Sequence, residues 1–227
     1  MLQPFGPEIW LSDGAPIKAA LGFHYPTRMA VMRLLDGSVA IWSPTALTPE
    51  GLEEIQQLGP IYALIAPNGL HHMHLADWVH ACPDAEVVAV PSLEKKRRDL
   101  LIDTFLTETG YSLWPGEIDH VLLETRITSE AVFFHHASGT VLFTDLLQQM
   151  PRTWYKGWRS WVARLDLMTE DEPTVPRKFR IAISDRDAAR RRVDTILDWP
   201  IQQVVMAHGT PVTEDAQAFL KRAFQWL

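Results

Sequence analysis

The spacing of apolar residues at the start of the chain predicts antiparallel hairpins. Apolar stretches at 8–11, 28–35 and 38–42 have the length and composition of strands. Asp36-Gly37 separates the last two stretches, and this dipeptide is typical of a two-residue hairpin turn. We therefore expect the chain to begin as an antiparallel sheet.

The following segment alternates between helical and strand-like spacing. A helix is expected after Thr48, which is placed to cap it, with Pro49 at its first position. Unbroken apolar runs at 61–66 and 86–90 have the length of strands buried on both faces, and apolar positions between 75 and 82 recur at helical intervals. Two strand–helix alternations favour parallel pairing of the strands.

The remainder of the chain predicts a longer helix over 93–107, a second group of strands and further helices. The strands are expected over 119–123, 130–134, 140–144 and 202–206, and the helices after the capping residues Asp145, Ser184 and Thr213. Two groups of hairpins, each followed by strand–helix units, are best accommodated by two sheets between layers of helices.

We therefore predict an α/β fold with a four-layer αββα sandwich, in which two mixed β-sheets are flanked by helices. One domain is expected to span residues 1–227, with a Trp/Arg-rich helical insertion at about 150–180. In that insertion Trp154, Trp158 and Trp161 recur at helical spacing, and the basic residues between them indicate a basic amphipathic helix. Core packing is the first interpretation; a cover over the site, a homodimer contact or attachment to an anionic membrane are the alternatives.

The amino-acid composition and charge exclude several classes of protein. The 227 residues are 47% hydrophobic and 22% charged, with a formal net charge of −7, as is typical of a folded, water-soluble protein. The acidic balance argues against nucleic acid as a partner, because phosphate binding needs a basic surface. The single cysteine, Cys82, suits a reducing compartment, and no apolar run is long enough to span a membrane. We therefore expect a cytoplasmic protein without a membrane span.

Side chains that can bind metal follow three of the predicted strands. They are His71, His72 and His74 after the run 61–66, Asp145 after 140–144, and His208 after 204–207. Ligands in α/β proteins commonly bind where strands end, so these side chains are expected to converge. Imidazole and carboxylate groups suit zinc or iron, and an ion with an open position can polarise water for hydrolysis.

The ordered set of motifs resembles the metallo-β-lactamase superfamily and, more narrowly, the DUF4336 domain family, a divergent branch of it. The resemblance is carried by Ala66-Pro67-Asn68-x-x-His71-His72, by His135-x-x-Ser138-x-Thr140 with Thr144-Asp145-Leu146-Leu147, and by His208-Gly209-x-Pro211. It implies the αββα fold and the metal-dependent hydrolysis of the superfamily.

The superfamily's metal ligands are only partly present. Its first motif, His-x-His-x-Asp-His, falls without gaps on Asn68, Leu70, His72 and Met73, and a slipped register leaves Ala76 and Asp77 where Asp and His belong. The next histidine position falls near Arg126 or Ile127, which are not ligands. Asp145 matches the bridging carboxylate and His208 the late histidine. The resemblance therefore implies a degenerate site for one ion rather than two.

Two functions remain open. In the first, His71, His72, Asp145 and His208 hold one Zn or Fe ion, Asp145 and His72 are catalytic, and the substrate is a small ester, thioester or phosphoester. Asn68, His74 and His135 are then expected to contact that substrate, although His135 could instead bond to Asp145 or to the turn at Ser138. In the second, the protein is metal-free and non-catalytic, and serves as a scaffold or binds a small ligand.

Overall fold

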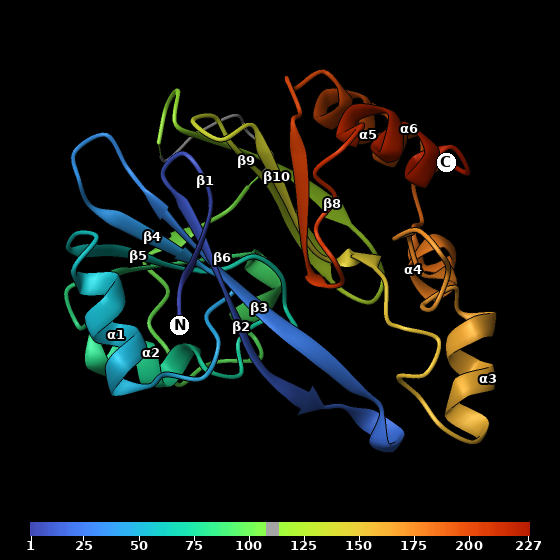
Figure 1. Cartoon of the computed structure of the whole chain (residues 1–227), viewed down its shortest axis with the longest axis horizontal. Coiled ribbons are helices and arrows are strands. Elements are labelled where there is room, and N and C mark those ends of the chain that lie inside the picture. The colour runs from blue at the N-terminus through green and yellow to red at the C-terminus, as the bar shows by residue number, and fades with distance from the viewer. Residues whose placement is uncertain (108–113) are drawn as a thin grey trace.

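The structure is a computed structural model that describes residues 1–107 and 114–227, and it contains two facing β-sheets (Figure 1). The first sheet has seven strands in chain order: β1 (Gln3–Gly6), β2 (Ile9–Lys18), β3 (His24–Arg33), β4 (Val39–Trp42), β5 (Ile61–Ala66), β6 (Glu86–Ala89) and β7 (Thr104–Phe105). The pairs from β1 to β4 are antiparallel, and those from β4 to β7 are parallel. The expected opening hairpins and the parallel strands after them are confirmed.

The second sheet has four strands in the order β11-β10-β9-β8. They are β8 (Ile118–Glu124), β9 (Ser129–His135), β10 (Thr140–Gln148) and β11 (Gln203–His208). The hairpins β8–β9 and β9–β10 are antiparallel, whereas β11 returns from the end of the chain and pairs with β10 in parallel. Both sheets are therefore mixed, as predicted.

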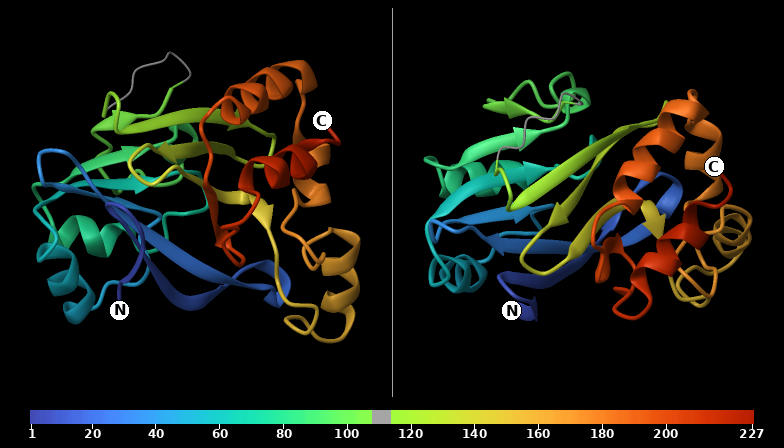
Figure 2. Two further views of the ribbon diagram at one scale, coloured as in Figure 1. Left: turned by 45° about the horizontal axis from the view of Figure 1, so that its top comes forward. Right: turned by 90° about the horizontal axis from the view of Figure 1, so that it is seen from above.

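Helices cover the outer face of each sheet (Figure 2). On the first sheet lie α1 (Pro49–Gln56), capped by Thr48 as predicted, and α2 (Leu75–Ala81); on the second lie α5 (Arg186–Leu197) and α6 (Ala216–Phe224). Two further helices, α3 (Trp158–Leu165) and α4 (Arg177–Ala182), follow β10 at one side of the molecule. No helix in the described part of the chain is both long and apolar enough to cross a membrane.

Side chains alternate between the two faces of each strand, and this alternation produces three apolar layers. In β10, Val141 and Phe143 pack under α5 and α6, whereas Leu142 between them faces the other sheet. In β4, Ala40 and Trp42 face the same central layer, and Val39 and Ile41 pack under α1 and α2. Because side chains in a strand alternate between faces, each buried strand supplies two layers at once. The predicted αββα sandwich is confirmed.

The helix expected over 93–107 is wrong. A short 3₁₀ turn at Pro91–Leu93 is followed by turns and then by β7. The end of this segment pairs with the edge of β6. Asp103 N donates to Val87 O (3.0 Å), and Leu106 N donates to Ala89 O (2.8 Å). A free parallel edge has outweighed the helical propensity of the basic stretch before it.

The predicted helix starts in the second half were also inaccurate. Asp145 does not cap a helix, because β10 continues through it to Gln148 beside β11. The cap of α5 is Asp185, one residue after Ser184, and it accepts a hydrogen bond from Ala188 N (2.8 Å). The last helix begins at Ala216, beyond Thr213, and has no side-chain cap.

The Trp-rich segment forms a helix, but its tryptophans do not pack in the core. Trp154 lies before α3, half-buried against a small core of Met150, Tyr155, Ala163 and Met168. Trp158 and Trp161 are 51% and 69% exposed. The expectation of core packing is therefore wrong for these two residues, because α3 turns its alanine rather than its tryptophans inward.

Candidate metal centre

Three separate elements bring a candidate ligand to one edge of the sandwich. Asp145 lies in β10, His208 is the last residue of β11, and His71 lies in the loop after β5. The parallel pairing of β10 with β11 brings Asp145 and His208 to the same end of their sheet. The facing sheet supplies His71 from the carboxyl end of β5, so the group spans both sheets. The predicted convergence of these three strand ends is observed.

One ligand atom from each of the three residues lies within 4.8 Å of the others, and the two imidazoles approach different oxygens of Asp145. His71 Nε2 lies 3.2 Å from His208 Nε2 and 3.4 Å from Asp145 Oδ2, and His208 Nε2 lies 3.5 Å from Asp145 Oδ1. Two ligand atoms on a tetrahedral zinc ion lie roughly 3.3 Å apart, given bonds of about 2.0–2.1 Å. The residues present therefore fit one ion, and no other His, Cys, Asp or Glu joins this group among the described residues.

Each imidazole is oriented through its other nitrogen. His208 Nδ1 donates to the carbonyl oxygen of Pro26 (2.6 Å), which leaves a lone pair on Nε2. His71 Nδ1 lies 2.8 Å from the hydroxyl oxygen of Ser43, which can accept its proton in the same way. Metal-binding histidines commonly use such partners to fix the ring and to keep the ligating nitrogen unprotonated. Burial lowers the pKa of His71, against the opposing effect of Asp145, and so favours the neutral ligand form.

Asp145 is held ionised. Burial by itself raises the pKa of its carboxyl, but hydrogen bonds and charge from His208 and His71 outweigh burial and hold the pKa well below the usual value. Asn68 Nδ2 donates to Oδ2 (2.7 Å), and Gln148 Nε2 donates to Oδ1 (3.0 Å). An anionic carboxylate beside two imidazole rings is a donor set suited to a divalent cation.

Asn68 organises the site rather than facing its cavity. Its side chain is fully buried, and Oδ1 accepts hydrogen bonds from Leu70 N (2.8 Å) and His71 N (2.9 Å) while the amide nitrogen holds Asp145. One side chain therefore ties the histidine loop to β10. The expectation that Asn68 contacts a substrate is not supported by this placement.

Glu130 is a second carboxylate beside the candidate site, and no role was predicted for it from the sequence. It is buried in β9, where its carboxylate accepts hydrogen bonds from the backbone nitrogens of Thr144 (2.8 Å), Asp145 (2.8 Å) and Leu146 (3.1 Å). Burial, with the charge of Asp145, raises the pKa of Glu130 to about 7 against the effect of these hydrogen bonds. A lone carboxylate in the run Ser129–His135 was the signal available in the sequence.

His72 and His74 do not join the three ligands. His72 turns toward Arg97, whose Nη1 lies 3.3 Å from His72 Nδ1 and donates to the His72 carbonyl oxygen (2.8 Å). His74 precedes α2 and lines a small neighbouring hollow. The predicted four-ligand set is therefore reduced to His71, Asp145 and His208, because adjacent residues in a loop point in different directions.

A cavity of about 420 Å³ opens onto the three ligands. Ile17, Lys18 and Ala19 of β2 and its turn, Tyr25 of β3 and Phe179 of α4 form much of its wall. Lys178 contributes an amine, which also lies 3.5 Å from Asp166 and 3.4 Å from the Tyr25 hydroxyl. His72 also lines this cavity, so it can reach a molecule bound beside the three ligands.

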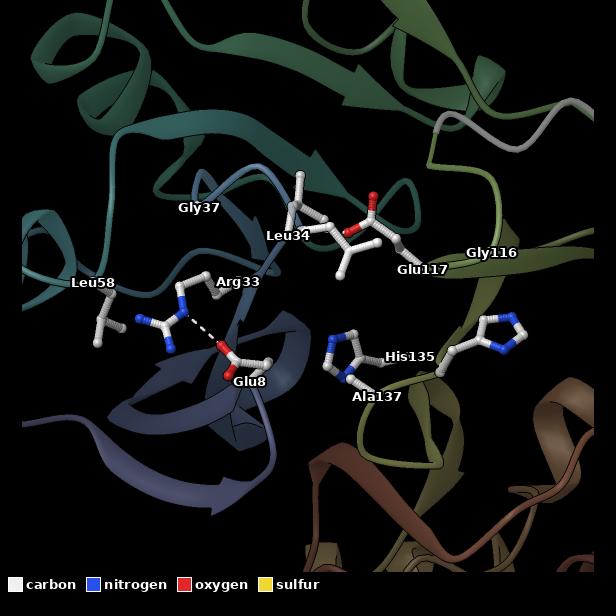
Figure 3. Close-up of a pocket in the computed structure, with 11 residues that line it drawn as sticks. Glu8, Arg33, Leu34, Gly37, Leu58, Gly116, Glu117, His135 and Ala137 are labelled. Carbon is white, nitrogen blue, oxygen red and sulfur yellow. Dashed lines mark hydrogen bonds and ion pairs between the residues drawn. The ribbon is translucent and has the colours of Figure 1, made fainter.

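His135 lies apart from the three candidate ligands. It ends β9 beside Thr140, at the opposite end of β10 from Asp145, and lines a larger cavity of about 600 Å³ with Glu8, Arg33 and Glu117 (Figure 3). Its Nδ1 bonds to the Ser138 hydroxyl (2.8 Å), which is the alternative role expected for it. Burial, with the charge of His136, lowers the pKa of His135 to about 4. The structure therefore separates His135 from the ligand group, and the expectation that it serves the same site is wrong.

Comparisons with solved structures define the class of fold. A metallo-β-lactamase from Pontibacter korlensis superposes with a TM-score of 0.64 at 10% identity, covering 99% of this chain and 98% of the other. A metallo-β-lactamase from Pseudomonas aeruginosa in its mono-zinc form gives 0.62 at 11%, covering 100% and 95%. A diflavin flavoprotein fragment from Nostoc sp. PCC 7120 gives 0.66 at 13%, covering 100% and 94%. The protein has the metallo-β-lactamase fold.

The family follows from the sequence. The model of DUF4336, a domain of unknown function, matches residues 8–157, and the chain belongs to this family. The matched range contains His71 and Asp145, whereas His208 and α3 to α6 lie beyond it. A search of curated proteins finds no match. The low identities to the solved structures show the fold alone, so the roles of the site residues rest on the geometry described above.

Proposed function

We propose that the protein is a metal-dependent hydrolase that uses one Zn or Fe ion held by His71, Asp145 and His208. The observation that carries this proposal is the convergence of their ligand atoms: the two Nε2 atoms lie 3.2 Å apart, and each lies 3.4 or 3.5 Å from a different oxygen of Asp145. Three protein ligands with a further open position are typical of catalytic zinc sites. An ion bound there supplies Lewis-acid activation of water and of a carbonyl or phosphoryl oxygen, which suits esters, thioesters and phosphoesters.

Residues of the chain itself supply hydrogen bonding and positioning for a substrate. Burial, with the charges of Arg97 and Lys96, lowers the pKa of His72, so its ring is neutral near pH 7. Arg97 offers only donors, so His72 Nδ1 accepts and the ring proton lies on Nε2. The Nε2–H group of His72 can therefore donate a hydrogen bond to an oxygen of a substrate in the cavity. Lys178 provides a positive charge for an anionic substrate in the same cavity.

A metal-free binding protein is the second candidate. It is favoured by the 3.2 Å separation of the two Nε2 atoms, because a hydrogen bond from one ring to the other can close the group without an ion. The cavity of about 420 Å³ would then bind a small molecule without transforming it. The two candidates differ in one measurable property, which is metal content.

The test is metal analysis by inductively coupled plasma mass spectrometry on protein purified without a histidine tag. We expect near-stoichiometric zinc or iron in the wild type, and loss of that metal in Asp145→Asn and in His208→Ala with the fold retained by circular dichroism. His135→Gln is the matched control, since it changes a buried histidine at the other end of β10. Chromogenic esters, thioesters and phosphoesters then test turnover. Folded wild type that takes up no metal on dialysis would reject the hydrolase and favour the binding protein.

A further inference from the structure

The outer face of α3 carries a solvent-exposed apolar stripe. Trp158, Trp161, Val162 and Leu165 are 51%, 69%, 41% and 64% exposed, and they follow the i, i+3, i+4, i+7 spacing of one helix face. Such a stripe normally faces a protein core. In α3 it is instead Ala163 that faces the protein, fully buried against Met150, Tyr155 and Met168.

Contacts with the β2–β3 hairpin fix the stripe in its outward orientation. Arg159 Nε donates to the carbonyl oxygen of Leu21 (2.8 Å), and the ring of Trp158 meets Phe23 edge-on at 5.8 Å. Leu21, at the hairpin tip, is itself 75% exposed. Figures 1 and 2 both show α3 beside this tip at one corner of the molecule. The stripe is therefore held beside the hairpin tip.

The charge of this corner is opposite to that of the protein as a whole. Residues 152–165 include four basic residues and no acidic one, in a chain whose formal net charge is −7. The guanidinium of Arg159 lies 4.9 Å from the ring centre of Trp158, and that of Arg164 lies 6.0 Å from that of Trp161. Cationic groups therefore border the exposed aromatic rings, an arrangement found in helices that lie at the surface of anionic bilayers.

We propose that α3 and the tip of the β2–β3 hairpin form a membrane-binding surface for anionic lipid. Trp158, Trp161 and Leu165 would enter the interfacial layer of the bilayer, while Lys156, Arg159 and Arg164 contact lipid phosphates. The basic charge favours this occupant over a second copy of the chain, because a two-fold contact would bring the same basic patch against itself.

The position of this surface also links it to the cavity beside the three ligands. Ile17, Lys18 and Ala19, which line that cavity, belong to the same hairpin arm as Leu21. A bilayer against α3 would therefore lie close to the cavity wall. The binding proposal stands independently of the metal, since none of the residues of the stripe is a candidate ligand.

The experiment is co-sedimentation of the full chain with large unilamellar vesicles. One set is phosphatidylcholine alone, and the other contains about 30 mol% phosphatidylglycerol. We expect binding to the anionic vesicles that weakens with added salt. Trp158→Ser/Trp161→Ser should lower the partition coefficient more than about tenfold, and Lys156→Gln/Arg164→Gln about tenfold or more, given the loss of two cationic contacts. The matched control is Leu35→Ser/Leu101→Ser, which removes two exposed leucines on other elements and should leave binding unchanged.

Other results would overturn the proposal. Absence of binding to either vesicle set would reject it, as would equal loss of binding in the leucine control. Sedimentation velocity on the same proteins tests the second copy as the occupant. A wild-type dimer that becomes monomeric in Trp158→Ser/Trp161→Ser, without vesicle binding, would assign the stripe to self-association. Circular dichroism and thermal unfolding establish that each variant is folded, and the charge variant gives an independent result if the tryptophan variant is not.

Discussion

Buried histidines and carboxylates from neighbouring elements lie beside the first residues of β10 and again toward its other end, and the two places differ in how their polar atoms are paired. At one end His135 is bonded to Ser138, and beside it Glu8 is paired with Arg33 at 2.5 Å. At the other end the ligating atoms of His71, Asp145 and His208 face one another within 3.5 Å. The first cavity is the larger, at about 600 Å³ against 420 Å³. Convergence of ligand atoms, rather than cavity size, therefore distinguishes the candidate metal site.

The largest expected effect is on metal binding at the Asp145 end. Asp145→Asn removes the only anionic ligand of the group and should weaken zinc affinity by more than about 100-fold, beyond the effect usual for outer-shell partners. Competition titration with a chromophoric chelator measures it. His135→Gln should leave the affinity unchanged, and a comparable loss in that variant would remove the distinction between the two ends.

The next effect concerns Glu130 in metal-free protein. Its pKa in the folded state is about 7, above the usual 4.5, so from pH 4.5 to 7 the folded chain keeps a proton that the unfolded chain loses. The folded state therefore loses stability as pH rises through this window, by about 2–3 kcal/mol. Urea unfolding of wild type and Glu130→Gln at pH 5 and pH 8 measures the difference, since glutamine lacks this titration. A difference that does not change with pH would mean that the backbone donors keep Glu130 ionised throughout.

A smaller effect is expected from the hydroxyls that hold the two histidines. Ser43→Ala removes the partner of His71 Nδ1 and should weaken zinc affinity by about tenfold or more, since it frees the ring orientation and tautomer. Ser138→Ala removes the corresponding partner of His135 and should not alter zinc affinity. The same chelator titration compares the two variants, and equal effects would contradict an orienting role for Ser43.

The smallest effect is expected at the Glu8 end. Glu8 adopts a φ of 58°, in the left-handed region that favours glycine, and its ion pair with Arg33 is partly exposed to solvent. Glu8→Gly relieves the backbone strain while losing a surface ion pair, so the melting temperature should change by less than about 2 °C. Differential scanning calorimetry would show it. A large fall would mean that this pair is as important to the fold as the Asp145 group.

Local patterns predicted most of the strands but fewer of the helix boundaries. Strands β5, β6, β10 and β11 are largely buried on both faces. A strand in that position needs a nearly unbroken run of apolar residues, and such a run is visible in the sequence. The segment 93–107 looked helical, yet it became turns and β7 because the edge of β6 was open to it. The edge of β6 lies outside the segment 93–107, so the residues of that segment alone do not predict this pairing.

The candidate site likewise combines features that the sequence predicts with features that depend on packing. The sequence alone determined that His71, Asp145 and His208 each follow or end an apolar strand, because a polar ligand type after a buried run stands out locally. Three other features depend on how the chain packs in three dimensions: His72 turns away, Asn68 and Glu130 hydrogen-bond around the site from the interior, and His135 lies toward the opposite end of β10. These outcomes depend on the direction of side chains in a loop and on strand register between distant segments. Such relations arise from packing, which no single stretch of residues specifies.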